Sequence, residues 1–192
     1  MMKKRGSASR WPKLALIAAV MMGTVLPTGW MPQAKAARAD HVVISEVYGG
    51  GGNSGALYKN DFIELYNPTD KAVSVGGWSV QYASATGTAW QKAGLTGSIA
   101  PYGFYLVQLA TSGAVGGELP TPDDSGTLNL SGTNGKVALV NNGDPLTGAD
   151  VTSQASVVDM VGFGTANSSE GNSPAPAPSN TTSVQRISDE RG

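Results

Sequence analysis

The sequence predicts an all-β fold, an antiparallel β-sandwich of about eight or nine strands that follows a signal peptide. Three observations support this prediction. From residue 40 onward, short runs rich in valine, isoleucine, leucine and aromatic residues alternate with clusters of glycine, asparagine, aspartate, serine and proline. Several of these runs alternate apolar and polar residues, which is typical of strands. No stretch of this region sustains the apolar periodicity of a capped helix.

The first 36 residues have the features of a secretory signal peptide. Residues 1–13 contain five basic residues and no acidic residue, and an uncharged apolar run of 13 residues follows from Leu14 to Leu26. A membrane-spanning helix needs about 20 apolar residues, so this run is too short for one. The next segment ends in small residues, and we expect cleavage after Ala36, or after Ala39. An uncleaved N-terminal anchor is the alternative.

Removal of the signal peptide makes the chain acidic. The full sequence has 13 basic and 14 acidic residues, and residues 1–36 contain six of the basic residues and none of the acidic ones, so the mature chain has a net charge of −7. Its basic residues are scattered, whereas proteins that bind the nucleic-acid backbone cluster theirs. We therefore expect no direct nucleic-acid binding and, after cleavage, no association with a membrane.

The mature domain is expected to span residues 40–190, and its strands are placed from their apolar runs. The expected strands are residues 41–48, 61–67, 77–84, 103–110, 127–130, 136–141, 157–164 and 183–187, with a shorter one at 88–93. Strand 103–110 is apolar on both faces, which predicts a central position in its sheet. Residues 164–182, rich in proline, alanine and serine, predict an extended surface connector before the last strand.

Four consecutive glycines, Gly49 to Gly52, separate the first two expected strands. A phosphate-binding loop needs a lysine at a fixed spacing and a helix whose N-terminus faces the phosphate. Here a strand is expected next, so the segment is interpreted as a long inter-strand loop. Such loops either bind a partner or only close one end of a sandwich. The candidate binding residues are Tyr48, Asn53, Tyr58, Asn60, Asp61 and, from the less regular segment 85–93, Trp90.

The residue types also limit the possible chemistry. There is no cysteine, and His41 is the only histidine. Disulfides, thiol nucleophiles and zinc sites built on cysteine or on several histidines are therefore excluded. We expect no metal, no cofactor and no enzymatic activity.

Carboxylates remain as candidates for catalysis. Glu46 and Glu64 lie inside expected strands between apolar residues. Two separated carboxylates are the minimum for glycoside hydrolysis, which keeps a carboxylate-dependent hydrolase as a hypothesis. A partly buried carboxylate needs a partner, however, and Arg186 in the last expected strand can supply it. We predict structural ion pairs between Arg186 and these glutamates. The aromatic residues of the strands, Phe104 among them, are expected in the core or half-buried beside it.

A set of motifs extends in order over nearly the whole mature chain. The motifs are Ile44-Ser45-Glu46-Val47, the glycine-rich loop, Asp61-Phe62-Ile63-Glu64-Leu65-Tyr66-Asn67, Gly77-Trp78-Ser79-Val80, Pro101-Tyr102-Gly103 and Ser183-Val184-Gln185-Arg186. Together they resemble the lamin tail domain family, specifically its secreted bacterial branch. The resemblance implies an immunoglobulin-like sandwich without catalytic residues. It also implies a docking module or, in bacteria, an accessory module that is often found next to secreted nucleases or phosphoesterases.

The sequence departs from that family in two places. Bacterial members often carry a cysteine pair at the positions that Asp150 and Ser168 occupy here. Members also commonly continue beyond the Gln-Arg pair, whereas this chain stops at Gly192.

The sequence thus predicts a secreted, non-catalytic binding or tethering module. Its expected partner is an unknown extracellular protein or cell-surface component. The alternative is the N-terminal accessory module of a truncated secreted enzyme, of nuclease or phosphoesterase type, whose catalytic part is absent from this chain.

Overall fold

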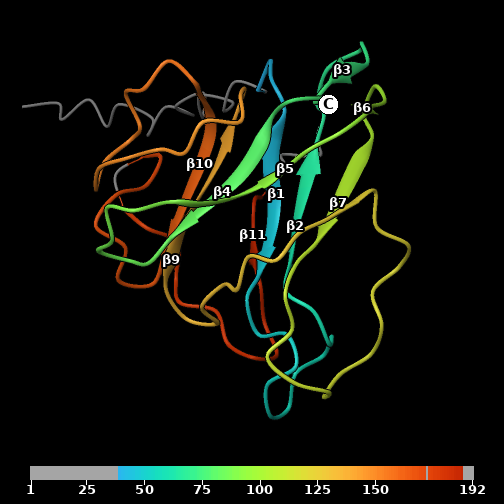
Figure 1. Ribbon diagram of the computed structural model, residues 1–192, viewed down its shortest axis with the longest axis vertical. Helices are drawn as coiled ribbons and strands as arrows, with labels where there is room; N and C mark the ends of the chain where they lie inside the picture. The colour runs from blue at the N-terminus through green and yellow to red at the C-terminus, as the bar shows by residue number, and fades with distance from the viewer. Residues whose placement is uncertain (1–38, 172, 188–192) are drawn as a thin grey trace, which may run out of the picture. The chain divides into compact units, whose positions relative to one another are not determined.

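The computed structural model describes residues 39–171 and 173–187 (Figure 1). The chain divides into two units, Met1–Lys35 and Ala36–Gly192, and the predicted signal peptide lies outside the described residues. The described part of the second unit contains eleven strands. Within it, no helix is long and apolar enough to cross a membrane.

The strands form two main sheets and a short ribbon. The five-stranded sheet has the order β11 (Val184–Gln185), β1 (Val43–Tyr48), β2 (Phe62–Tyr66), β7 (Phe104–Gln108), β8 (Asp124–Ser125). The four-stranded sheet has the order β10 (Val157–Phe163), β9 (Gly135–Val140), β4 (Ser79–Ala83), β5 (Gln91–Gly94). The ribbon pairs β3 (Val73–Ser74) with β6 (Ser98–Ile99). The paired strands are antiparallel, except for the parallel pair of β7 and β8.

Figure 1 shows the strands of the two main sheets, and the main apolar core draws its residues from both sheets. In β2, Ile63 and Leu65 are fully buried in this core, whereas Glu64 and Tyr66 on the opposite face are partly exposed. From the four-stranded sheet, β9 contributes Leu139 to the same core. Successive side chains of a strand point to opposite faces, so each sheet buries one face against the other. The predicted all-β antiparallel sandwich is confirmed.

Strand β9 is buried along its whole length because both of its faces are covered. One face contributes to the main core, and the other contacts a smaller apolar cluster. The members of this cluster are Ala83, Trp90, Ala138, Val140, Leu146, Val151 and Met160. The loops that contain Trp90, Leu146 and Val151 therefore cover the outer face of the four-stranded sheet.

Most of the expected strands are present, with small shifts at their ends. The expectation of a strand at 127–130 is wrong, although Leu128 and Leu130 are buried in the core. The backbone of this segment bonds irregularly: Leu128 accepts a hydrogen bond from the Ala110 amide (3.0 Å), and the Leu130 amide donates to the carboxylate of Asp61 (2.8 Å). Strands β3, β6 and β8 have two residues each, too few to produce an alternating pattern.

The connector after β10 is fixed to the sandwich at several points. The Ala175 amide donates to the carbonyl of Gly162 (2.8 Å), and the Gly164 amide donates to the carbonyl of Ala175 (2.9 Å). Further along, the carbonyl of Asn180 accepts a hydrogen bond from the Tyr48 hydroxyl (2.6 Å). These bonds lead the chain to β11, which pairs with β1 and completes the edge of the five-stranded sheet.

Candidate functional site

The four glycines pack against the backbone of neighbouring loops. A Cβ added at Gly51 would lie 2.3 Å from the amide nitrogen of Asp61, and one at Gly49 would lie 2.3 Å from the carbonyl oxygen of Ser131. Gly52 has a φ of 74°, a conformation that glycine adopts without strain. The loop leads into β2 and lacks the helix N-terminus of a phosphate-binding loop. The glycine loop thus forms a tightly packed junction with the neighbouring loops of the domain.

Asp61 is the polar centre of this junction. Its side chain is fully buried, and its two carboxylate oxygens accept hydrogen bonds from the amides of Gly51 (2.9 Å) and Leu130 (2.8 Å). It therefore ties the glycine loop to the irregular segment that follows β8. Burial raises the pKa of Asp61 to about 6, although the two amides oppose this effect. The carboxyl group of Asp61 thus has a structural role.

The raised pKa of Asp61 predicts a pH-dependent stability. The folded state holds the proton more tightly than the unfolded state, so the free energy of unfolding falls as pH rises from about 4 to about 6. We expect Asp61 to account for about 2 kcal/mol of this fall. Denaturant titrations at several pH values compare the wild type with Asp61→Asn. The variant should lose that part of the pH dependence, and an unchanged profile would contradict the assignment.

The aromatic residues in and beside the candidate loop pack into a cluster at the same end of the sandwich. The ring of Tyr48 stacks on Phe62 at 5.4 Å between centroids, and Tyr58 packs edge-on against both rings. The Tyr48 hydroxyl also accepts a hydrogen bond from the Leu57 amide (3.1 Å). Asn53 contacts the side chain of Asn180 (Nδ2–Oδ1 3.4 Å). Four of the candidate residues, Tyr48, Asn53, Tyr58 and Asp61, therefore lie together and bond mainly within the domain.

Two further candidates are also bonded within the domain. Asn60 donates its side-chain amide to the carbonyl of Leu109 (2.8 Å). Trp90 was a candidate for an exposed contact with a partner, and this expectation is wrong, because the side chain belongs to the smaller apolar cluster and is only 6% exposed. Its indole Nε1 donates to the carbonyl of Gly148 (3.0 Å). Trp90 is buried by the loop that contains Leu146 and Gly148. Gly148 is 58 residues away in the chain, so the sequence around Trp90 gives no sign of the contact.

Lys136 occupies a cage beside Trp90 that sequence reasoning missed. Its side chain is fully buried, and its ammonium group donates to the carbonyls of Gly87 (2.9 Å) and Ala149 (2.6 Å) and to Asn167 Oδ1 (2.9 Å). The ammonium nitrogen also lies 5.4 Å from the centroid of the Trp90 ring. Burial lowers the pKa of Lys136, and the nearby Asp150 carboxylate opposes that effect. The ammonium group of Lys136 thus connects three loops to β9 through its hydrogen bonds.

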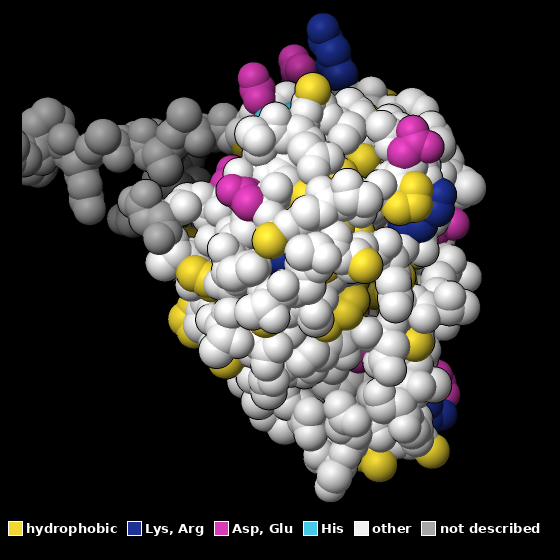
Figure 2. All heavy atoms as spheres, turned by 60° about the vertical axis from the view of Figure 1, so that its left-hand side comes forward, with side chains coloured by type: hydrophobic (Ala, Val, Ile, Leu, Met, Phe, Trp, Pro, Cys, Tyr) yellow, Lys and Arg dark blue, Asp and Glu magenta, His cyan; other side chains and the backbone are white. Residues whose placement is uncertain are grey.

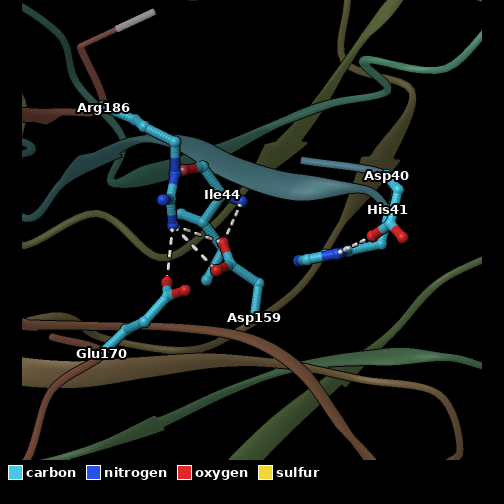
Figure 3. A network of polar contacts seen from close by, with 6 residues as sticks. All are labelled: Asp40, His41, Ile44, Asp159, Glu170 and Arg186. Carbon is cyan, nitrogen blue, oxygen red and sulfur yellow. Dashed lines mark hydrogen bonds and ion pairs between the residues drawn. The ribbon is translucent and has the colours of Figure 1, made fainter. Parts of the chain in front are cut away.

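Arg186 forms the main ionic cluster of the described residues (Figure 3). Its guanidinium contacts both oxygens of Asp159 (2.8 and 2.9 Å) and one oxygen of Glu170 (3.1 Å). Its Nε donates to the carbonyl of Ile44 (3.2 Å), and the Ile44 amide donates to Asp159 (2.6 Å). The cluster thus joins the residue that follows β11 to β1, to β10 and to the connector that contains Glu170.

The predicted ion pairs of Arg186 with Glu46 and Glu64 are therefore wrong. Both glutamates lie on the outer face of the five-stranded sheet, directly opposite each other in the β1–β2 pairing. Arg186 instead bonds to Asp159 of the other sheet and to Glu170 of the connector. Glu64 accepts a hydrogen bond from the Ser45 hydroxyl (2.7 Å). The sequence pattern identified partly buried carboxylates correctly but could not tell which face of the sheet they occupy.

The ionic cluster has little capacity left for catalysis. Burial raises the pKa of Asp159, but both of its oxygens already accept hydrogen bonds from Arg186 and the Ile44 amide. His41 hydrogen-bonds to Asp40 (3.0 Å) beside the cluster (Figure 3). No group of three or more histidine and acidic residues in the described part of the chain could hold a metal ion.

A groove of about 220 Å³ lies next to the cluster, between the β1–β11 edge and β10. Glu46, Met160, Glu170 and Arg186 are among its lining residues. Sites for small molecules usually have volumes of about 300–1,000 Å³. The groove is smaller and shallow, so its shape does not favour a small-molecule site.

Comparison with known proteins decides the family. The family model described as Lamin Tail Domain matches residues 35–165. The chain belongs to the lamin tail domain family. The comparison with curated proteins found no match. The lamin tail domain is a non-catalytic module of immunoglobulin-like fold, in agreement with the sandwich described above.

The lamin tail domain of this chain has a hydrogen bond between Asp150 and Ser168, the positions at which the resemblance to bacterial members implies a cysteine pair. The Ser168 hydroxyl donates to Asp150 Oδ1 (2.8 Å), and hydrogen bonds from Thr152 lower the pKa of Asp150. The two positions are 18 residues apart in the chain and belong to the loops that Lys136 also contacts through Ala149 and Asn167. A polar contact thus connects these loops without a covalent bridge.

Introducing cysteines at positions 150 and 168 is expected to stabilise this lamin tail domain. The side chains of Asp150 and Ser168 already touch, so the double variant Asp150→Cys/Ser168→Cys should form a disulfide in air. Closing a loop of this length raises the free energy of unfolding by about 3 kcal/mol. Urea denaturation with and without reductant measures the difference. A variant that stays reduced, or gains no stability when oxidised, would contradict this expectation.

Proposed function

We propose that this chain is a secreted, non-catalytic binding or tethering module. One observation carries the proposal: the buried charged groups bond to partners within the domain, whereas large apolar side chains are exposed on its surface. Among the described residues, the exposed large apolar side chains are those of Leu57, Tyr58, Tyr102, Phe104, Val115 and Ile187. Exposed apolar side chains that pack together, as Phe104 does on Tyr66 with 4.8 Å between ring centroids, are typical of interaction surfaces. This arrangement favours contact with another macromolecule over chemistry on a substrate.

The proposed partner is an extracellular protein or a cell-surface component. After removal of residues 1–36 the chain has a net charge of −7, which disfavours a polyanionic partner such as DNA. Lysine and arginine side chains appear at separate places on the face shown in Figure 2, and uncharged groups cover most of it. Such a surface lacks the clustered cations that bind a phosphate backbone.

Secretion is tested by expressing the full chain in a bacterial host. The expected mature protein appears in the culture medium and begins at residue 37 or 40, because cleavage is expected after Ala36 or Ala39. N-terminal sequencing of the secreted protein identifies the cleaved bond. Retention of an uncleaved chain in the cell fraction would contradict the proposal.

Binding is tested with the mature domain immobilised on a resin. The resin is exposed to cell-wall glycan, to DNA and to culture proteins at two salt concentrations. We expect retention of a protein or cell-surface component and no salt-sensitive retention of DNA. If nothing is retained under any condition, or if DNA binds and is released by salt, the proposed function is wrong.

A further inference from the structure

An exposed aromatic patch lies on the outer face of the five-stranded sheet. Phe104, the first residue of β7, is 61% exposed, although its position in a strand predicts burial. Its ring packs on Tyr66 of β2 with 4.8 Å between centroids. Tyr102, just before β7, is 51% exposed. These three side chains form what we call the aromatic patch, and the expectation of a buried or half-buried Phe104 is wrong.

Tyr102 holds its place in the patch at an energetic cost. It has a φ of 54°, and it is the only non-glycine residue with a positive φ among those the structure describes. An L-residue with a large side chain loses about 1–2 kcal/mol in this conformation relative to its usual ones. Backbone strain of this kind often accompanies a functional role. In this conformation the side chain of Tyr102 is half exposed, two residues before Phe104 in the chain.

An acidic pair adjoins the aromatic patch on the same face. Glu46 of β1 and Glu64 of β2 are directly opposed, and Leu106 of β7 lies opposite Glu64. Like charges in opposed positions destabilise a sheet. Within the described ranges, no lysine, arginine or histidine nitrogen lies within 4.0 Å of either carboxylate. The surface thus has two negative charges that an incoming cation would neutralise.

The spacing of these groups matches an extended peptide. The pair Phe104–Tyr66 and the pair Leu106–Glu64 are neighbouring rungs on one face, separated by two residues along each strand. Such rungs are about 7 Å apart, which equals the spacing of alternate side chains in an extended chain. A lysine or arginine stem can lie on the aromatic rings while its charged group meets a carboxylate. Alternate side chains of one peptide can therefore contact both rungs.

We propose that the aromatic patch and the acidic pair together bind an extended, basic segment of a partner protein. This inference deepens the proposed binding function and rests on it. Opposite charge selects the partner, and the rings of Tyr66, Tyr102 and Phe104 supply the apolar contact. The groove beside Arg186 adjoins this surface, because Glu46 lines both, but none of the three aromatic residues lines it.

The test measures fluorescence anisotropy of a labelled peptide of about ten residues with alternating arginine and serine. The wild-type mature domain should bind it, and binding should weaken as salt is raised. The double variant Glu46→Gln/Glu64→Gln and the single variant Phe104→Ser should each weaken binding about tenfold. Tyr102→Asn should also weaken binding, yet unfold at the same or a higher temperature, because asparagine tolerates the left-handed conformation.

Matched controls separate this surface from the overall negative charge. Glu118→Gln/Asp144→Asn removes two exposed carboxylates at other places, and Leu57→Ser removes an exposed apolar side chain near the glycine loop. Both controls should bind the peptide within about twofold of the wild type. Equal losses in control and test variants, or no binding of the basic peptide by the wild type, would overturn the proposal.

The partner-retention experiment distinguishes the two proposals. If the wild type retains a culture protein and Phe104→Ser retains it equally well, the proposed surface is wrong while the binding function stands. If the wild type retains nothing, the binding function itself fails. Preference for a neutral glycan or for a glutamate–serine peptide over the arginine–serine peptide would also overturn the proposed partner chemistry.

Discussion

Replacing Gly51 with alanine is expected to destabilise the domain by at least about 3 kcal/mol, which lowers Tm by about 10 °C. The new Cβ would lie 2.3 Å from the backbone at Asn60 and Asp61. These atoms cannot yield as a flexible side chain would, because the Asp61 amide donates to the carbonyl of Ala110 (2.8 Å). The Gly51 amide also donates to the Asp61 carboxylate, so a shift would break a buried hydrogen bond.

Two other glycines provide controls for the Gly51 variant. Gly94 of β5 has no atom within 4 Å of an added Cβ, so Gly94→Ala should change stability by less than about 1 kcal/mol. Gly55 has the same free space but a φ of 78°, so Gly55→Ala should cost about 1 kcal/mol from backbone strain alone. Thermal unfolding followed by circular dichroism ranks the three variants. A Gly51→Ala protein as stable as Gly94→Ala would show that the glycine loop is loosely packed.

Replacing Lys136 with methionine is expected to lower the free energy of unfolding by about 3 kcal/mol. Methionine keeps the apolar stem but leaves three acceptors without their donor: the carbonyls of Gly87 and Ala149 and the side-chain oxygen of Asn167. The lowered pKa of Lys136 shows that its buried charge already carries a desolvation cost. Removing the charge recovers part of that cost, so the loss is smaller than the sum of three buried hydrogen bonds.

Lys92→Met is the matched control for Lys136→Met. Lys92 is also in the four-stranded sheet and also donates to a carbonyl, that of Gly143, but its side chain is exposed. Water replaces an exposed hydrogen bond, so this variant should change stability by less than about 0.5 kcal/mol. Urea denaturation measures both variants. A Lys136→Met protein more stable than the wild type would show that desolvation outweighs the three hydrogen bonds, as occurs at some buried ion pairs.

Much of the sandwich was predictable because its strands carry their own signals. β2 alternates buried and half-exposed residues, and β7 lies between β2 and β8, the central position that its two apolar faces predict. The segment 127–130 has the apolar pattern of a strand, and Leu128 and Leu130 are indeed buried. Their backbone bonds to Ala110 and Asp61 instead of to a neighbouring strand, and no local pattern encodes that choice.

The candidate site was harder to predict than the fold. The sequence places Asp61 and Tyr48 at one end of the sandwich. It does not show that they form hydrogen bonds with Leu130 and Asn180, which connect loops of the domain itself. Phe104 was expected in or beside the core because apolar residues flank it in the sequence. When a strand is apolar on both faces, its sequence does not show which face is exposed to solvent, because that depends on the segments that cover it. Here no segment of the described chain covers Phe104.

The sequence by itself determined the fold class, the lamin tail family and the lack of cysteine chemistry, because these depend on residue types and on local periodicity. Only the tertiary structure decided the partners of the charged residues. Arg186 bonds to Asp159 across the two sheets, Lys136 sits in a cage of three loops, and Glu46 opposes Glu64 on an outer face. Such contacts join residues far apart in the chain, and strand register and loop packing, which local patterns do not specify, place them together.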